Sequence, residues 1–166
     1  MKIFLIGMPG SGKSTLGKRL AKEMLTSFVD LDKEIEKREG KSVQRIFAEN
    51  GEDYFRQAES KELIEWAGSD KSFVMATGGG TPCFFEGIKV INQSGLSIFL
   101  DVPLSALFSR LGKKTDRPLL NATDIEEKKE RLSSLLANRS QYYQQANITV
   151  KNADLSKVMT AIRLRK

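Results

Sequence analysis

The residues with the clearest chemistry form a glycine-rich run from residue 7 to residue 15, which reads GMPGSGKST. The run follows a short apolar stretch, Ile3–Ile6, and matches the phosphate-binding pattern G-x-x-x-x-G-K-[ST]. In this pattern backbone N–H groups converge on phosphate oxygens, and the amino end of the next helix adds its positive dipole. Lys13 reaches the β- and γ-phosphates, and the Ser14 hydroxyl is a hard ligand for Mg²⁺. We therefore predict that a nucleotide binds to six residues of the run: Gly10, Ser11, Gly12, Lys13, Ser14 and Thr15.

Two carboxylates, Asp30 and Asp32, follow the second apolar run, Phe28-Val29. At the carboxyl end of a strand, Asp30 can hold Mg²⁺ through water while Asp32 faces the hydroxyl group of an acceptor. The alternative is that Asp32 caps a helix expected to begin at Lys33. The spacing of the two residues leaves both interpretations open.

A third apolar run, Ser72–Ala76, ends in Thr77 and three consecutive glycines, Gly78, Gly79 and Gly80. Glycines at the end of a buried strand let the backbone approach a ligand with no side chain in between. The run therefore predicts one wall of a binding pocket. The alternative, a flexible connector, is less favoured because the glycines directly follow a buried strand.

Arg56 and Glu59 lie three residues apart on a helix expected from Tyr54 to Trp66, so the carboxylate can fix the guanidinium group. The alternative is an ion pair on the surface, which would contribute little.

The segment after Arg110 is basic and polar, and it ends at Pro118. A loop of about 12 residues in a small domain is often a lid over an active site. We predict a mobile lid at about 112–123, in which Arg117 neutralises charge that develops on the transferred phosphoryl group.

Five apolar runs alternate with segments of helical periodicity along the chain, and helix breaks are expected at Gly40 and Gly51. The last two runs are Ser97–Leu100 and Ile148–Val150. This order predicts a single α/β domain, 1–166, with a doubly wound, parallel, five-stranded sheet. Such sheets bind ligands at the carboxyl ends of their strands, where the residues named above are expected.

The composition excludes several kinds of chemistry. The 166 residues include no histidine, so a general base must be a carboxylate, a lysine or a tyrosine. Cys83 is the single cysteine, which excludes disulfides and cysteine zinc sites and favours a cytoplasmic protein. No apolar run approaches the roughly 20 residues that cross a bilayer, so no membrane is expected. The net charge of +6, carried by the second half of the chain, indicates polyanionic partners or a solvated surface.

With these motifs in this order, the sequence resembles the shikimate kinases over nearly its whole length. The resemblance rests on six groups of residues: Gly7–Thr15, Asp30-Leu31-Asp32, Phe55-Arg56 with Glu59, Thr77–Gly80, Arg117–Leu120, and Asn138-Arg139 followed by Tyr143. It implies a P-loop fold like that of the nucleoside monophosphate kinases. It also implies transfer of the γ-phosphoryl group of ATP, with Mg²⁺, to the 3-hydroxyl of shikimate.

The resemblance also implies roles for single residues. Asp32 contacts the ring hydroxyls and acts as base or orienting group, and Lys13 and Arg117 complete the catalytic set. The shikimate carboxylate lies between Arg56 and Arg139, beside the wall formed by 78–80. On the ATP side the resemblance adds Arg110 and Arg117, and the helices of about 32–66 form the acceptor side.

Two positions depart from the family pattern. The last strand-to-helix turn, 151–154, has no arginine, which leaves the adenine contacts open. Asp101 ends an apolar run like the aspartate of a second nucleotide motif, but the expected topology favours a structural role for it.

Three other functions compete with this interpretation. A gluconate kinase shares the P-loop and the acidic second strand, but the triple glycine favours shikimate as the acceptor. A GTPase switch is disfavoured because no Asn-Lys-x-Asp motif is present. A nucleic-acid-dependent ATPase is disfavoured because the basic residues have little aromatic interleaving. The expected partners are therefore ATP and shikimate, with no nucleic acid, and the protein is expected to be a monomer.

Overall fold

A computed structural model of the chain describes residues 1–111 and 125–165. Its strands are β1 (Lys2–Ile6), β2 (Ser27–Asp30), β3 (Phe73–Ala76), β4 (Leu96–Asp101) and β5 (Ile148–Lys151). Its helices are α1 (Lys13–Glu23), α2 (Leu31–Glu39), α3 (Val43–Gly68), the short 3₁₀ helix η1 (Thr81–Cys83), α4 (Gly87–Ser94), α5 (Leu104–Leu111), α6 (Ile125–Tyr143) and α7 (Leu155–Leu164).

The five strands form one parallel sheet in the order β2-β3-β1-β4-β5. Leu5 in the central strand pairs with Ala76 of β3 on one side and with Ile98 of β4 on the other. This arrangement confirms the predicted five-stranded parallel sheet. Because β1, β2 and β3 run side by side in the same direction, the segments that follow them meet at one edge.

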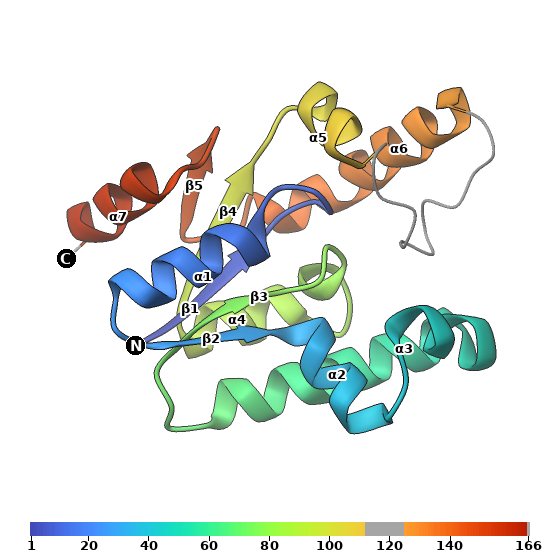
Figure 1. Cartoon of the computed structure of the whole chain (residues 1–166), viewed down its shortest axis with the longest axis horizontal. Coiled ribbons are helices and arrows are strands. Elements are labelled where there is room, and N and C mark those ends of the chain that lie inside the picture. The colour runs from blue at the N-terminus through green and yellow to red at the C-terminus, as the bar shows by residue number, and fades with distance from the viewer. Residues whose placement is uncertain (112–124, 166) are drawn as a thin grey trace.

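The two faces of the sheet bury alternate residues of the strands, as expected for a period of two. In β1, Ile3 and Leu5 pack with residues of α1 and α7, whereas Phe4 and Ile6 pack with residues of α3, α4 and α6. Beyond the strand ends, α2 and α3 lie on one side and α5 and α6 on the other, with the glycine-rich loop between them (Figure 1). The predicted doubly wound fold is therefore confirmed.

Two glycines break the helices that follow β2, where the sequence predicts the breaks. Gly40 ends α2 with a φ of 68°, and Gly51 interrupts α3 with a φ of 83°. Positive φ angles of this kind cost a residue with a side chain free energy, which explains glycine at both places. As a result, α3 consists of a short first part, 43–50, and a long second part, 52–68, which carries Arg56.

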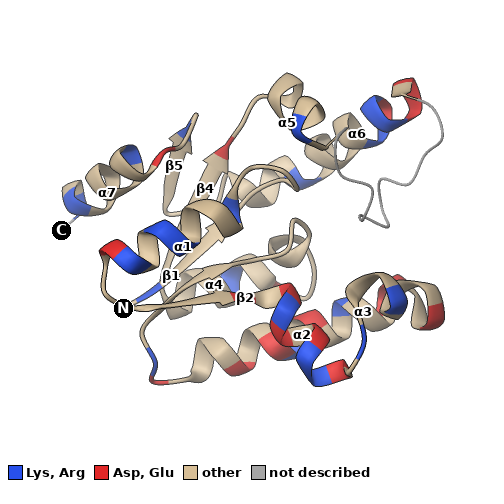
Figure 2. Ribbon diagram, in the orientation of Figure 1, with Lys and Arg blue, Asp and Glu red and all other residues tan. Residues whose placement is uncertain are grey.

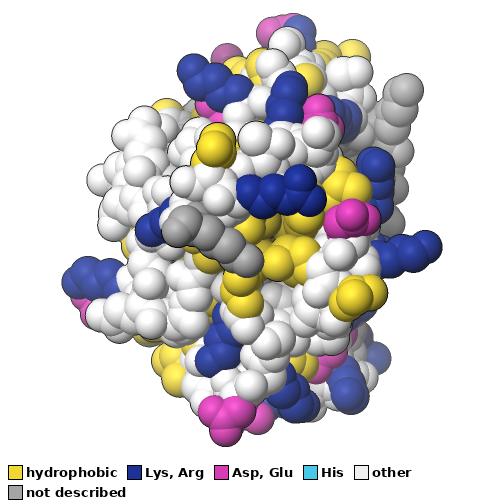
Figure 3. Space-filling model, turned by 90° about the vertical axis from the view of Figure 1, so that its left-hand side faces the viewer, with side chains coloured by type: hydrophobic (Ala, Val, Ile, Leu, Met, Phe, Trp, Pro, Cys, Tyr) yellow, Lys and Arg dark blue, Asp and Glu magenta, His cyan; other side chains and the backbone are white. Residues whose placement is uncertain are grey.

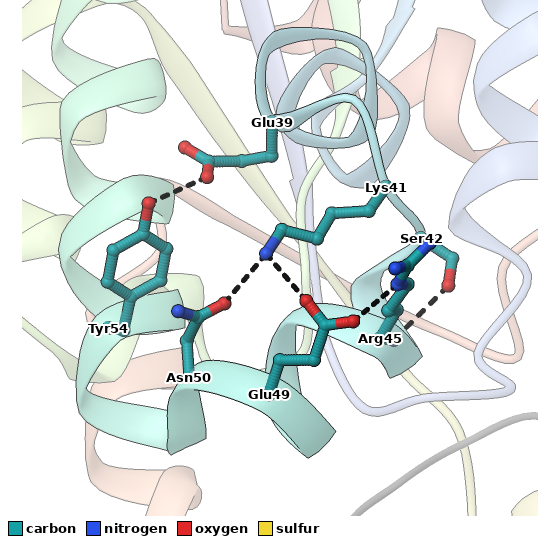
Figure 4. Close-up of polar contacts among 7 residues, drawn as sticks. All are labelled: Glu39, Lys41, Ser42, Arg45, Glu49, Asn50 and Tyr54. Atoms are coloured by element: carbon teal, nitrogen blue, oxygen red, sulfur yellow. Dashed lines mark hydrogen bonds and ion pairs between the residues drawn. The ribbon is translucent and has the colours of Figure 1, made fainter.

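A polar cluster joins the end of α2 to both parts of α3 (Figure 4). The hydroxyl of Tyr54 donates a 2.7 Å hydrogen bond to Glu39. Lys41 donates to Glu49 at 2.9 Å and to Asn50 at 3.0 Å. Arg45 also donates to Glu49, and its backbone N–H bonds to Ser42, which caps α3. The cluster therefore connects the segments on either side of both glycine breaks.

Charged side chains are distributed unevenly over the fold. Acidic side chains gather on α2 and α3, whereas basic ones are prominent on α1 and α7 (Figure 2). The acidic side of the molecule is thus the one that carries the polar cluster. Among the described residues, no helix has the length and apolar character needed to cross a membrane.

Candidate active site

The glycine-rich loop connects β1 to α1 and begins that helix at Lys13. Gly10 and Gly12 have φ angles of 80° and 93°, which only glycine adopts at low cost. The N–H of Ser11 bonds to the carbonyl of Met8 at 3.1 Å, which closes the turn. The backbone therefore has the form that the sequence predicts: a loop whose N–H groups, with the amino end of α1, are directed to one point.

Two polar side chains of this loop, Ser11 and Lys13, are buried. The ammonium group of Lys13 is buried and donates to the carbonyl groups of Gly7, at 2.8 Å, and Met8, at 2.9 Å. The Ser11 hydroxyl is buried and makes no hydrogen bond within the part of the chain that the structure describes. A buried hydroxyl and a buried ammonium group in one loop suit the binding of an anion such as phosphate.

Ser14 and Asp30 come from different elements and contact each other directly. The hydroxyl of Ser14 donates to a carboxylate oxygen of Asp30 at 2.9 Å. A hydroxyl and a carboxylate are the hard oxygen ligands that Mg²⁺ prefers, and two such ligands with phosphate oxygens and water suit that ion. In residues 1–111 and 125–165, no group of three or more acidic, histidine or cysteine side chains is arranged to hold a metal ion.

The two aspartates at the junction of β2 and α2 have different local roles. Asp30 is the residue that caps α2, because its carboxylate accepts a long bond of 3.4 Å from the N–H of Lys33. The alternative interpretation of Asp32 as the helix cap is therefore wrong. Asp32 lies in the first turn of α2 and lines a cavity of about 700 Å³ together with Lys13 and Gly79.

That cavity brings together most of the residues that the sequence predicts for the nucleotide. Its walls include residues of the glycine-rich loop, the two aspartates and the start of the glycine run: Gly10, Ser11, Gly12, Lys13, Ser14, Thr15, Asp30, Asp32, Thr77, Gly78, Gly79 and Arg110. Segments that are distant in the sequence thus meet in one hollow at the carboxyl edge of the sheet.

Arg56 is not among the residues that line this cavity; it lies against Gly80, which follows the cavity-lining Gly79, and is buried, with 4% of its surface exposed. It donates to Glu59 at 2.9 Å, and that carboxylate is also buried. It also donates to the more exposed Glu52 at 3.2 Å, and its guanidinium carbon lies 4.3 Å from the centre of the Phe84 ring. The alternative of a surface ion pair is therefore wrong for Arg56 and Glu59.

Arg139 reaches the same region from α6 and is also buried, with 5% exposure. Within the described residues, no carboxylate forms an ion pair with it. Its neighbour on the helix is Tyr143, whose hydroxyl donates to the carbonyl of Gly79 at 2.6 Å. Burial raises the pKa of Tyr143, so its hydroxyl remains a hydrogen-bond donor. A buried guanidinium group without a carboxylate is a site for an anionic ligand.

The three glycines after β3 make room for side chains of the protein. A Cβ at Gly78 would lie 2.6 Å from a carboxylate oxygen of Glu59, and one at Gly79 would lie 2.8 Å from Nη1 of Arg139. A Cβ at Gly80 would overlap the guanidinium group of Arg56. Each glycine therefore accommodates one charged side chain of the protein, and Gly78 and Gly79 also line the cavity, while the wall toward a ligand stays a prediction.

Comparison with known proteins assigns the chain to a family. The model for the family described as "Shikimate kinase" matches residues 9–164. The chain belongs to the shikimate kinase family. A shikimate kinase of Phocaeicola vulgatus is 45% identical over 155 residues, which cover 93% of this chain and 88% of the relative. One from Bacteroides fragilis is 41% identical over 171 residues, which cover 100% and 95%.

Solved structures of shikimate kinases confirm the fold. The crystal structure of the Bacteroides thetaiotaomicron protein has a TM-score of 0.87 at 35% identity, and the match covers 99% of this chain and 96% of that one. The Acinetobacter baumannii protein, solved in complex with shikimate, has a TM-score of 0.87 at 31% identity, and the match covers 99% and 90%. The resemblance stated from the sequence motifs is thereby confirmed.

The sequence of this shikimate kinase family member indicates three further features of the nucleotide side: Arg110, Arg117 with the lid, and the turn at 151–154. Arg110, at the end of α5, donates to the carbonyl of Gly10 at 3.1 Å. Arg117 and the predicted lid at 112–123 lie outside the described residues. Ala153 and Asp154 line the cavity, so the turn before α7 does reach it.

Asp101 does not line this cavity; its backbone carbonyl accepts from the N–H of Asn152 at 3.1 Å. This contact agrees with the structural role that the sequence analysis favours for Asp101.

Sequence reasoning assigned no role to two residues that contact the site, Thr81 and Phe84. Thr81 follows the three glycines and bonds to Glu59, and Phe84 covers one face of Arg56. The position of Thr81 directly after the glycine run was the only signal available. Which carboxylate it would contact depends on how α3 packs against η1.

Proposed function

We propose that this protein transfers the γ-phosphoryl group of ATP to the 3-hydroxyl of shikimate and releases shikimate 3-phosphate and ADP. The observation that carries the proposal is the pair of buried arginines, Arg56 from α3 and Arg139 from α6, at adjacent glycines beside the phosphate loop. A small acid held there by its carboxylate extends toward Asp32 and the loop. The shikimate complex of the Acinetobacter baumannii relative supports this choice of acceptor.

The two arginines recognise the acceptor by charge and by shape. Burying a guanidinium group costs free energy unless an anion or hydrogen-bond acceptors lie next to it. Glu52 and Glu59 are the anions next to Arg56, whereas the carboxylate of the bound acceptor is the anion next to Arg139. Planar, two-point hydrogen bonding also fixes the orientation of the ring, which is needed for an in-line transfer.

Asp32 is the proposed catalytic carboxylate. It lines the cavity between the glycine-rich loop and the glycine run, so it is placed to accept a hydrogen bond from an acceptor hydroxyl. It orients that hydroxyl toward the γ-phosphoryl group and takes its proton as the new P–O bond forms. Phosphoryl transfer depends mainly on positioning and charge, which explains how the chain functions without histidine.

Lys13 and the loop N–H groups hold the β- and γ-phosphates, and Ser14 and Asp30 are the proposed Mg²⁺ ligands. The ion, when bound with ATP, neutralises part of the phosphate charge. We propose that Arg110 and Arg117 contact ATP and that Arg117 acts from a lid at 112–123. We also propose that 1–166 is one domain and that the helices within 32–66 form its acceptor side.

The test is ADP production from ATP and Mg²⁺ with a panel of small hydroxy acids, followed by identification of the product. We expect shikimate to give the highest kcat/KM and its 3-phosphate to be the product. If gluconate or AMP were the better acceptor, the shikimate assignment would fail while nucleotide binding at the loop would stand. ADP release without any acceptor would instead favour an ATPase.

Monomeric state and cytoplasmic location remain predictions. Figure 3 shows the side of the molecule that lies at the left of Figure 1, where hydrophobic side chains gather in a hollow between basic ones. Large hydrophobic residues near the termini, Met1 and Leu164, are exposed. Sedimentation equilibrium tests the oligomeric state, and we expect the mass of a single chain of 18.6 kDa.

A further inference from the structure

The hydroxyl of Thr81 makes a buried hydrogen bond that the proposed reaction does not itself require. Thr81 begins η1, directly after the three glycines, and 3% of its surface is exposed. Its Oγ1 donates to Oε2 of Glu59 at 2.7 Å. Gly78 borders this bond, because a Cβ there would lie 2.6 Å from Oε2 and 3.0 Å from Oγ1.

Glu59 divides its two oxygens between two partners. Oε1 accepts from Nη1 of Arg56 at 2.9 Å, while Oε2 accepts from Thr81. Glu59 is 2% exposed, so water does not replace either partner freely. Each bond therefore restricts the rotation of the carboxylate, and the plane of the carboxylate sets the position of Nη1.

The remaining contacts of Arg56 leave donors for a ligand. A guanidinium group has five N–H donors. Within the described residues, Glu52 accepts from Nε and Nη2, and Glu59 accepts from Nη1. One N–H on Nη1 and one on Nη2 remain available, and Phe84 packs against a face of the group. These two N–H groups match the two oxygens of a carboxylate.

We infer that Thr81 is a positioning residue for the acceptor: its hydroxyl orients Glu59, which in turn fixes Arg56 for the acceptor carboxylate. This inference rests on the proposed function, because it takes shikimate as the ligand of Arg56. Thr81 touches neither substrate, and its effect reaches the acceptor through two side chains in series.

The test is steady-state kinetics of Thr81→Val, which keeps the shape of the side chain and removes the donor. Loss of a hydrogen bond to a charged group corresponds to roughly tenfold or more in binding. We expect the KM for shikimate to rise about tenfold, while kcat and the KM for ATP stay within about twofold. Thr81→Ser keeps the hydroxyl and should return the shikimate KM to within about twofold of the wild type.

A double-mutant cycle with Glu59→Ala separates positioning from a general loss of stability. If Thr81 acts through Glu59, Thr81→Val should change the shikimate KM less than about twofold in the Glu59→Ala background. Ser97→Ala is the matched control, since Ser97 is a fully buried hydroxyl of β4 that bonds to Asn92 and Asn147. It should lower the melting temperature without changing either KM.

Several outcomes would overturn the inference. They are an unchanged shikimate KM in Thr81→Val, equal rises in both KM values, or effects of Thr81→Val and Glu59→Ala that multiply independently. If Thr81→Val does not fold, Thr81→Ala takes its place, and failure of both to fold would assign the hydroxyl to stability alone. If the wild type is inactive on shikimate, the proposed function itself is wrong. This result differs from each of the outcomes for the Thr81 variants.

Discussion

The guanidinium group of Arg139 lies in the space that a side chain at Gly79 would need, with Nη1 2.8 Å from the position of a Cβ. One residue follows β3 and the other belongs to α6, so the contact ties the acceptor side of the site to a helix from the second half of the chain. The hydroxyl of Tyr143 reinforces it through the carbonyl of Gly79. The geometry at this glycine therefore decides where Arg139, one of the two arginines proposed to bind the acceptor carboxylate, lies.

Gly79→Ala should displace Arg139 and weaken acceptor binding. A Cβ at 2.8 Å from Nη1 and from Pro9 forces both neighbours to move. We expect the KM for shikimate to rise at least about tenfold, since a charged hydrogen bond is misplaced. Gly68→Ala is the control, because a Cβ at Gly68 meets no atom within 4 Å. Unchanged shikimate kinetics in a folded Gly79→Ala protein would contradict this account of the glycine run.

Arg56 and Arg139 should each contribute about 10- to 100-fold to kcat/KM for shikimate, as expected for charged hydrogen bonds. Arg56→Lys should be nearly as harmful as Arg56→Ala, because lysine cannot form the two-point contact. A shikimate analogue without the carboxylate should be a poor substrate for the wild type and lose little more with either variant. If that analogue suffers as much as shikimate from Arg56→Ala, then Arg56 has a structural role only.

Lys13→Ala should lower kcat by orders of magnitude while the fold is retained. The ammonium group bonds to two loop carbonyls, at 2.8 and 2.9 Å, and these weak acceptors are replaced when phosphates bind. Turnover and the melting temperature are measured on the same preparation. A folded variant with near-normal turnover would show that the loop lysine does not stabilise the transferring phosphoryl group.

The polar cluster around Gly40 and Gly51 should make the stability of the protein depend on pH in the acidic range. The pKa of Glu49 is lowered to about 2, mainly by the hydrogen bond from Lys41 and next by the one from Arg45. A lowered folded-state pKa adds stability that is present above the unfolded-state pKa and is lost as the pH falls toward the folded-state value.

The melting temperatures of wild type and Glu49→Gln test this expectation. The wild type should melt at the higher temperature near pH 7, and the gap should close as the pH falls from about 4.5 to about 2. A gap that is absent at pH 7 would show that the interaction is screened by solvent. A gap that persists at pH 2 would show that it does not come from the charge of Glu49.

The conformation of the glycine-rich loop could be predicted from the sequence because its residues are neighbours in the chain. From Gly10 to Thr15, covalent spacing and the strand–loop–helix order leave few conformations. The same holds for the helix breaks at Gly40 and Gly51, which are local demands on φ. The five apolar runs also predicted the strands, since a short apolar run between helical segments is a local feature of the chain.

The partners of each polar group, in contrast, were decided by tertiary structure. Spacing could not distinguish Asp30 from Asp32 as the cap of α2, because both carboxylates precede or begin the same helix. Nor could it show that Arg56 and Glu59 are buried, since a helical pair three residues apart occurs equally on surfaces.

The three consecutive glycines, 78–80, show most clearly what the sequence predicts and what tertiary structure decides. They indicated a close approach from the sequence alone. Which groups approach was set by the packing of α3, η1 and α6 around the end of β3, which places Glu59 at Gly78, Arg139 at Gly79 and Arg56 at Gly80. Contacts between residues far apart in a chain depend on the shapes of all the side chains between them, and no local pattern records those shapes.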